Sequence, residues 1–214
     1  MIKVENIDVW GFEHAIRGMR NPLNSWHKSD SIFEEASEVG SVELEIPEIG
    51  PNDLDLMKRL YKAGTEHRKY LRQIMVSMDI VAPLYWWKET DQYRIGVTTN
   101  SCSTMHKIAA KEFVLDDFSH EHLTDISEAV MVEVCRVLNT WRTLYLESKD
   151  KEDWWQMIQL LPSSYNQRRT ITMNYENVVT IIKQRTGHKL DEWNQYVEIL
   201  KDLPYVREII GERP

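Results

Sequence analysis

Residues 161–185, LPSSYNQRRTITMNYENVVTIIKQR, place a strand pattern directly before a helix pattern. The segment RRTITM at 168–173 predicts a short strand. From Asn174 to about Arg185 the apolar residues recur at helical spacing, which predicts a helix with one buried face. The inward-facing residues of that helix are expected to be Val178, Val179, Ile181 and Ile182. The two patterns adjoin, so the chain is expected to pass from strand to helix without a loop.

A second strand pattern lies upstream, between residues 70 and 81. Its apolar residues recur at every second position, which predicts a strand with one buried face. These residues are Ile74, Val76, Met78 and Ile80, and Pro83 is expected to end the strand. Weaker patterns predict further strands at residues 2–10 and at 42–46 (VELEI).

Helical patterns account for most of the remaining chain. A helix is expected to begin at Asn52, which serves as an Asx cap, and to end at Gly64. Further helices are expected at 84–91, 105–111, 125–147, 150–161 and 190–200. Strands and helices do not alternate regularly, so the predicted class is α+β. We expect a single domain over residues 1–214, with a mixed sheet wrapped by helices.

The charge balance excludes several classes of protein. The 214 residues contain 26 Lys and Arg against 34 Asp and Glu, a net charge of −8. General nucleic-acid binding needs clustered cations, so it is not expected. No apolar run approaches the roughly 18 residues of a membrane span, and the first ten residues are charged where a signal peptide is apolar. We expect a cytoplasmic protein in which Cys102 and Cys135 are free thiols.

The common enzyme motifs do not occur in this sequence. It contains no GxGxxG after a strand, no P-loop, no GxSxG, no HExxH and no CxxC pair. His120 and His122 are expected on a solvated surface, and no metal site is predicted. Composition and periodicity alone therefore indicate only a soluble α+β domain.

One stretch carries a more specific resemblance. Residues 88–104, KETDQYRIGVTTNSCST, follow the Glu66-His67 pair and the strand that ends near Pro83. Within them, Gln92-Tyr93-Arg94 is followed by seven residues and then Cys102. This arrangement resembles the signature of the flavin-dependent thymidylate synthases, in which Arg-His-Arg, seven residues and a serine follow a Glu-His pair and a strand.

Residues 161–185 resemble the C-terminal pattern of the same family. That pattern contains Leu-Pro, an arginine, a strand ending in Asn, a helix ending in Arg eleven residues later, and a Glu soon after. The matching residues here are Arg168, Asn174 and Arg185, followed by DEW at 191–193. The two blocks together cover roughly half of the chain, in the expected order.

The resemblance implies a fold, ligands and site residues. It implies a homotetramer that binds FAD and a pyrimidine nucleotide between subunits and converts dUMP to dTMP. Methylenetetrahydrofolate is then the one-carbon donor and NADPH the source of electrons. The residues that match flavin-contacting positions are Gln92, Tyr93, Arg94 and Asn174, and those that match nucleotide-contacting positions are Glu89, Arg168 and Arg185.

Several residues depart from the family pattern. Gln92 and Tyr93 replace an arginine and a histidine, and Glu89 replaces a glutamine that contacts the nucleotide. Thr104 stands where a phosphate-binding arginine is expected, and Glu176 where an arginine beside the flavin is expected; Asn100 replaces a glutamate. Each lost charge-assisted hydrogen bond weakens binding by about 1.5–3 kcal/mol. Together these changes are large enough to abolish ordinary affinity for FAD or dUMP.

Two hypotheses follow from the resemblance and the departures. The first is a divergent flavin-dependent thymidylate synthase-like enzyme. The second is a protein that keeps the fold without catalysis and acts as a nucleotide-binding or protein-binding inhibitor or regulator. Cys102, in place of the serine, is the candidate catalytic residue, since a stabilised thiolate could add to C6 of a pyrimidine. A passive replacement of the serine is the alternative.

Overall fold

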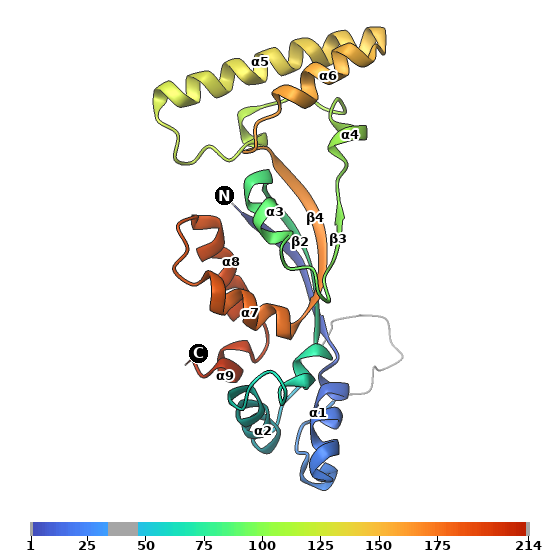
Figure 1. The fold of residues 1–214 in the computed structure, drawn as a ribbon, viewed down its shortest axis with the longest axis vertical. Helices are drawn as coiled ribbons and strands as arrows, with labels where there is room; N and C mark the ends of the chain where they lie inside the picture. The colour runs from blue at the N-terminus through green and yellow to red at the C-terminus, as the bar shows by residue number, and fades with distance from the viewer. Residues whose placement is uncertain (1, 34–46, 213–214) are drawn as a thin grey trace. The chain divides into compact units, whose positions relative to one another are not determined.

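The computed structural model describes residues 2–33 and 47–212, and four strands in these ranges form one sheet (Figure 1). The sheet order is β1-β2-β4-β3, with β1 at Lys3–Trp10, β2 at Met75–Pro83, β3 at Thr98–Ser101 and β4 at Asn166–Asn174. The α+β class is confirmed. The sheet is antiparallel rather than mixed, because the end of β2 pairs with the start of β4, and the start of β2 with the end of β4.

Nine α-helices lie in the described ranges. They are α1 (Phe12–Arg20), α2 (Pro51–Lys62), α3 (Leu84–Thr90), α4 (Thr104–Lys107), α5 (Asp125–Ser148), α6 (Lys151–Leu160), α7 (Tyr175–Arg185), α8 (Asp191–Lys201) and α9 (Val206–Ile210). Short 3-10 helices are η1 (Asn21–Leu23), η2 (Trp26–Lys28), η3 (Lys69–Arg72) and η4 (Leu115–Asp117). None of the described helices is long and apolar enough to cross a membrane.

The structure corrects some of the predicted boundaries. β2 begins at Met75 rather than near residue 70, because the preceding residues form η3. α4 ends at Lys107 and is shorter than the helix expected at 105–111. α2 begins one residue early, because Pro51 fits the first helical position and Gly50, not Asn52, is the N-cap. The strand predicted at 42–46 lies outside the described residues.

Three elements were not predicted. β3 forms where a loop was expected, and all four of its residues are exposed. Its residues show no apolar alternation, so only its pairing with β4 defines it as a strand. α1 and α9 are short helices in segments that glycine and proline interrupt.

Residue contacts divide the chain into two compact units. Unit 1 comprises Met1–Val4, Asp79–Gln92 and Thr99–Thr170, and unit 2 comprises Glu5–Met78, Tyr93–Thr98 and Ile171–Pro214. A single domain over residues 1–214 stays a prediction.

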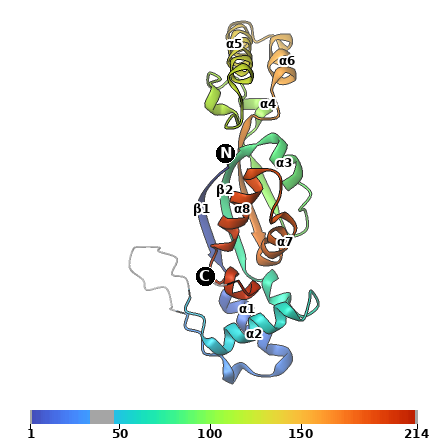
Figure 2. The same cartoon turned by 90° about the vertical axis from the view of Figure 1, so that its left-hand side faces the viewer.

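The core of unit 1 lies beside the paired helices α5 and α6. These helices lie side by side in both ribbon views (Figures 1 and 2). Leu138 and Met157 are fully buried between the helices and the segment that precedes α5. The side chain of Asn139 holds that segment, because it bonds to both the backbone N–H and the carbonyl of Phe113, each at 2.8 Å. Cys135 is a buried free thiol, as predicted, and Cys102 is an exposed one.

The core of unit 2 joins α7 and α8 to the strands. Val178 of α7 and Trp193 of α8 are fully buried, and the two helices lie against each other (Figure 2). The hydroxyl of Tyr196 on α8 lies 3.6 Å from the sulfur of Met78 on β2. The helix predicted at residues 174–185 is therefore confirmed as α7, and the residues expected to face inward are buried.

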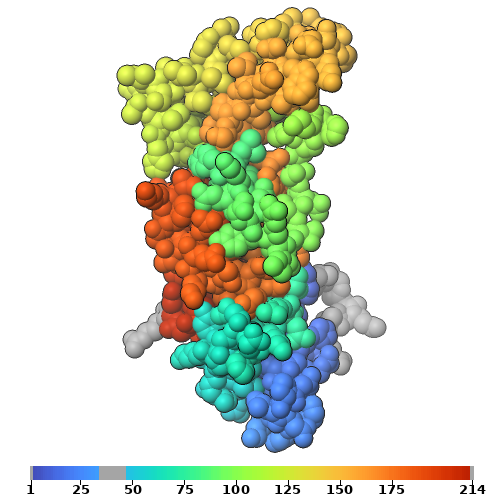
Figure 3. Space-filling view, in the orientation of Figure 1, coloured from blue at the N-terminus to red at the C-terminus, as the bar shows by residue number. Residues whose placement is uncertain are grey.

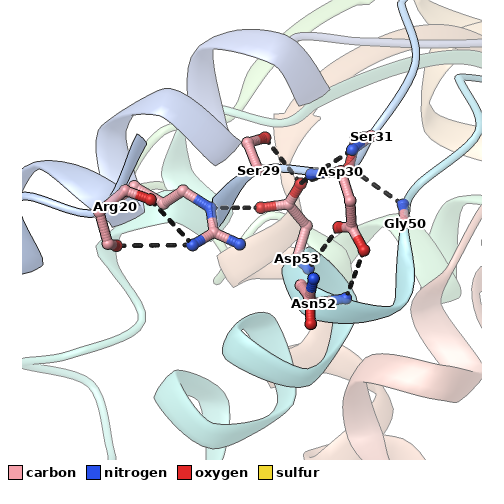
Figure 4. Close-up of polar contacts among 8 residues, drawn as sticks. Arg20, Ser29, Asp30, Ser31, Gly50, Asn52 and Asp53 are labelled. Carbon is pink, nitrogen blue, oxygen red and sulfur yellow. Dashed lines mark hydrogen bonds and ion pairs between the residues drawn. The ribbon is translucent and has the colours of Figure 1, made fainter. Parts of the chain in front are cut away.

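A buried carboxylate holds the start of α2 (Figure 4). Asp53 has no exposed surface and accepts a 2.5 Å hydrogen bond from Nε of Arg20, whose side chain is also buried. It also accepts hydrogen bonds from the hydroxyls of Ser29 and Ser31 and from the backbone N–H groups of Asp30 and Ser31. Burial raises the pKa of Asp53, but the hydrogen bonds outweigh it and leave the pKa below its usual value.

The same segment supplies the missing cap of α2. Gly50 has no side chain that could accept a hydrogen bond from the first turn. The carboxylate of Asp30 accepts those bonds instead, from the N–H groups of Asn52 at 2.9 Å and Asp53 at 3.1 Å. Residues 29–31 therefore cap the helix from a distant part of the chain.

Candidate functional site

The pairing of β3 with β4 determines the position of Cys102 in unit 1. Its backbone N–H donates to the carbonyl of Arg168 at 2.9 Å, and Nε2 of Gln167 donates to its carbonyl at 2.8 Å. These bonds hold the exposed Cys102 beside β4, at the level of Arg168. The structure thus brings together two residues that the sequence assigned to a site.

A pocket of about 260 Å³ opens beside Cys102. Its lining comes from β2, the start of α4, the segment before α5 and the start of β4; we call it the Cys102 pocket. The lining residues are Val81, Cys102, Ser103, Thr104, Lys107, Lys111, Asp116, Asp117, Tyr165, Asn166, Gln167 and Arg168. The pocket therefore includes Thr104, the position at which the resemblance predicts a phosphate contact.

Three cations and two carboxylates line the Cys102 pocket. Arg168 donates to Asp79 at 2.7 Å, and Lys111 forms a close ion pair with Asp117. Within the described ranges, Lys107 forms no ion pair or side-chain hydrogen bond. Its ammonium group is therefore the pocket cation without a counter-ion.

Asn166 contributes a buried acceptor to the same lining. Its Oδ1 atom is inaccessible to solvent and has no hydrogen-bond partner among the described residues. An unsatisfied buried acceptor costs stability, about 1–3 kcal/mol.

Glu89 and Gln92, the other site predictions in unit 1, do not line the pocket. Glu89 is half-buried on α3. Nε2 of Gln92 donates to the carbonyl of Lys88 at 3.3 Å, so this side chain bonds back to the last turn of α3, which ends two residues before it. The structure does not bring these two residues to Cys102 and Arg168.

In unit 2, Arg185 and Tyr93 contact each other directly. Nε of Arg185 donates to the hydroxyl of Tyr93 at 2.9 Å, and that hydroxyl donates to Gln184 at 3.0 Å. The guanidinium also lies over the ring of Trp193, 4.4 Å from its centroid. Tyr93, predicted to face the flavin, and Arg185, predicted to face the nucleotide, therefore contact each other and Trp193. Trp193 belongs to this cluster, although the sequence singled it out only as part of DEW.

Asn174 serves as the N-cap of α7. Its Oδ1 accepts from the backbone N–H of Asn177 at 3.1 Å and from the Asn177 side chain at 3.0 Å. Gly96 adopts a positive φ of 72°, and a Cβ there would lie 2.8 Å from Nδ2 of Asn174. This close approach fixes the loop that carries Arg94, whose side chain is exposed.

Glu176, another residue that departs from the family pattern, forms an ion pair with Arg68 in unit 2. Its carboxylate accepts three hydrogen bonds of 2.8–3.1 Å from the guanidinium of Arg68. Both side chains are largely buried, with 17% and 16% of their surfaces exposed. Arg68 also lies over the ring of Tyr61 at 5.2 Å. The anion at position 176 is thus matched by a cation of the chain itself.

These contacts do not fit a bound FAD. Its pyrophosphate is anionic and needs cations or free N–H donors. Among the positions that the resemblance assigns to flavin, Tyr93 bonds to Gln184 and Arg185, and Asn174 caps α7. Arg94 is the sole cation of that set, and the carboxylate of Glu176 is neutralised by Arg68.

Lys107 and Asn166 are the pocket residues that sequence reasoning missed. Neither belongs to a motif or to a position that the family pattern singles out. The signal for Lys107 is its spacing: it follows Thr104 by three residues, which places both on one side of a short helix. Among the described residues, no group of three or more His, Cys, Asp or Glu side chains could hold a metal ion.

Comparison with known proteins finds no similar sequence among protein families and curated proteins, but it finds solved structures with a similar fold. No family model and no curated protein sequence matches the chain. Two solved structures of flavin-dependent thymidylate synthase ThyX from Helicobacter pylori, with FAD and dUMP, are similar to it. One is 17% identical over 98% of this chain and 97% of that chain, with a TM-score of 0.68. The other is 17% identical over 96% and 97%, with a TM-score of 0.67.

The chain has the ThyX fold. The similarity extends over nearly the full length of both chains, so the fold expected from the two sequence blocks is confirmed. At 17% identity the ThyX likeness establishes the fold alone.

Proposed function

We propose that this protein binds a pyrimidine nucleotide such as dUMP in the Cys102 pocket, as a divergent relative of ThyX. The observation that carries the proposal is the composition of the pocket. It gathers Arg168 and Lys107, two cations suited to a phosphate, with the polar amide side chain of Asn166. A uracil ring carries an N3–H donor and carbonyl acceptors, which an amide side chain can bind.

The size of the pocket supports a small ligand. Its volume of about 260 Å³ lies slightly below the range of about 300–1,000 Å³ that is common for drug-sized ligands. A mononucleotide that leaves one group in solvent suits this space better than a dinucleotide such as FAD. The two ThyX structures hold dUMP together with FAD, which is consistent with this proposal.

Calorimetric titration of the protein with dUMP tests the proposal, and Arg168→Ala sharpens the test. The variant should weaken dUMP binding by roughly tenfold or more, the usual loss of one charge-assisted hydrogen bond. Arg136→Ala is the matched control, because Arg136 is exposed on α5, pairs with Glu133 and does not line the pocket. Equal affinity of the two variants and the wild type would argue against a nucleotide at Arg168.

The second candidate function is complete thymidylate synthase chemistry. This function is the conversion of dUMP to dTMP with FAD, methylenetetrahydrofolate and NADPH. The match to a ThyX structure with FAD over 98% of this chain and 97% of that chain favours it. The ion pair at Glu176 and the self-contacts of Tyr93 and Arg185 weigh against it.

An absorbance spectrum separates these two functions. A protein that binds nucleotide alone should be colourless when purified and should not retain added FAD, with or without dUMP. Flavin absorption bands in the purified protein, or FAD binding that dUMP tightens, would favour the enzyme. Cys102 is then the side chain to test for a covalent role, by comparing Cys102→Ser with the wild type.

We also propose that the chain forms a homo-oligomer, with the tetramer of the resemblance as the expected state. The outer side of α5 supports this proposal, because apolar residues recur there at positions 126, 130, 137 and 144. Ile126 is 81% exposed and Val130 is 59% exposed. In the space-filling view, α5 (yellow) and α6 (orange) form one continuous surface of unit 1 (Figure 3). Spacing of seven residues is typical of a helix that pairs with a second helix.

Substitution on α5 tests that surface. Val130→Glu should shift the protein toward smaller species in sedimentation velocity, because it places a charge in an apolar contact. Val132→Glu is the matched control: Val132 is 53% exposed on the same helix but lies outside the 126–144 stripe. An identical sedimentation profile for both variants would contradict a role for the stripe in assembly.

A further inference from the structure

We infer that Lys107 binds the phosphate group of the nucleotide in the Cys102 pocket. The inference rests on the proposed function and assigns a specific residue to it. The resemblance predicts a phosphate-binding arginine at position 104, where this chain has Thr104. Lys107 lines the same pocket from the end of α4 and restores a cation there.

The charge balance of the lining distinguishes Lys107 from the other two cations. A cation that already has a carboxylate partner gains less from a phosphate, because the new contact competes with an existing ion pair. Arg168 has Asp79 as such a partner, and Lys111 has Asp117. Lys107 has no carboxylate within ion-pair distance in the described part of the chain. Its positive charge is the one in this pocket that a dianionic ligand would neutralise without displacing a carboxylate.

The backbone of α4 is held in place by two hydrogen bonds at residues that precede Lys107. Oγ of Ser103 accepts from the N–H of His106 at 3.2 Å, which closes the turn at its start. Nε1 of Trp154 on α6 donates to the carbonyl of Met105 at 3.1 Å. The turn is therefore fixed although it is short, and the exposed Lys107 side chain supplies a flexible ammonium that can follow a phosphate.

The ligand class follows from two groups in one lining. An uncompensated ammonium calls for an anion, and the amide side chain of Asn166 in the lining can hydrogen-bond to a base. A nucleoside monophosphate carries both an anion and a base. Free phosphate carries only the anion, and a nucleoside carries only the base. The pocket is therefore expected to bind the monophosphate more tightly than either part.

Calorimetry with dUMP, deoxyuridine and inorganic phosphate tests the inference on the full chain. The wild type should bind dUMP more tightly than deoxyuridine or phosphate. Lys107→Ala should weaken dUMP binding by about tenfold and leave deoxyuridine binding unchanged. Lys107→Arg should retain most of the dUMP affinity. Lys62→Ala, at an exposed lysine of α2 outside the pocket, is the matched control and should behave as the wild type.

The outcomes separate this inference from the proposed function. If the wild type prefers dUMP to deoxyuridine and Lys107→Ala keeps that preference, the nucleotide site stands and the assignment of Lys107 is wrong. If the wild type binds neither dUMP nor deoxyuridine, the proposed function fails and the inference fails with it. Unchanged circular dichroism of Lys107→Ala would show that a loss of dUMP binding does not come from unfolding.

Discussion

Asp53→Asn is expected to lower the free energy of unfolding by about 3–5 kcal/mol, the usual cost of removing one partner of a buried ion pair. Arg20 is 3% exposed and pairs with Asp53 at 2.5 Å, so the variant leaves a buried guanidinium without its counter-ion. The neutral amide also cannot accept all the hydrogen bonds that the serine hydroxyls and backbone N–H groups donate to the carboxylate. Urea denaturation of the variant and the wild type measures the effect.

Asp55→Asn is the matched control for that experiment. Asp55 lies two residues further along α2 and pairs with Arg59 at 2.8 Å, but both side chains are about two-thirds exposed. Asp55→Asn should lower the free energy of unfolding by less than about 1 kcal/mol, as for most exposed ion pairs. Equal losses for the two variants would contradict the account of the Asp53 network.

The difference in stability between the wild type and Asp53→Asn should depend on pH in one direction. Burial raises the pKa of Asp53, but the hydrogen bonds from Ser31, Ser29 and Arg20 hold it below its usual value of about 3.9. A carboxylate with a lowered pKa in the folded state stabilises the protein fully above its unfolded pKa. That contribution is lost as the pH falls through the folded pKa. The stability difference between wild type and Asp53→Asn should therefore be constant near neutrality and shrink below about pH 4.

Glu176→Arg is expected to have the second large effect, lowering the free energy of unfolding by about 3 kcal/mol or more. The substitution replaces the partner of Arg68 by a second guanidinium, at a position where both side chains are more than four-fifths buried. The repulsion is only weakly screened there, because little water reaches the pair. Thermal and urea denaturation measure this loss.

The charge-swapped double variant tests whether the pair itself is responsible. Arg68→Glu together with Glu176→Arg restores opposite charges and should recover part of the lost stability. Recovery is expected to be incomplete, because Arg68 also stacks on Tyr61. A double variant as unstable as the sum of the single variants would show that the two residues act independently.

The sequence predicted elements well where burial imposes a period. β2 alternates buried and half-buried residues, and α7 buries the residues that the helical spacing selected. β3 could not be predicted in this way, because both its faces are exposed and its existence depends on hydrogen bonds to β4. The cap of α2 was also missed, because Asp30 supplies it from a segment 22 residues away from Asn52.

The candidate site was predictable only in part, for a similar reason. Periodicity places residues on faces of elements, whereas a site depends on which elements pair. The family resemblance assigned Cys102 and Arg168 to one nucleotide site, and the structure joins them by a backbone hydrogen bond. It did not reveal that Arg185 stacks on Trp193 or that Glu176 pairs with Arg68, which lies 108 residues away. Charge compensation of this kind requires three-dimensional proximity and leaves no local pattern.

The most direct test of the central claim is a calorimetric titration of the purified full chain with dUMP, alongside deoxyuridine. The cationic Cys102 pocket predicts saturable binding of dUMP that is clearly tighter than that of deoxyuridine, because the phosphate meets Lys107 and Arg168. No heat of binding for dUMP, or equal affinity for dUMP and deoxyuridine, would contradict a nucleotide site that recognises the phosphate.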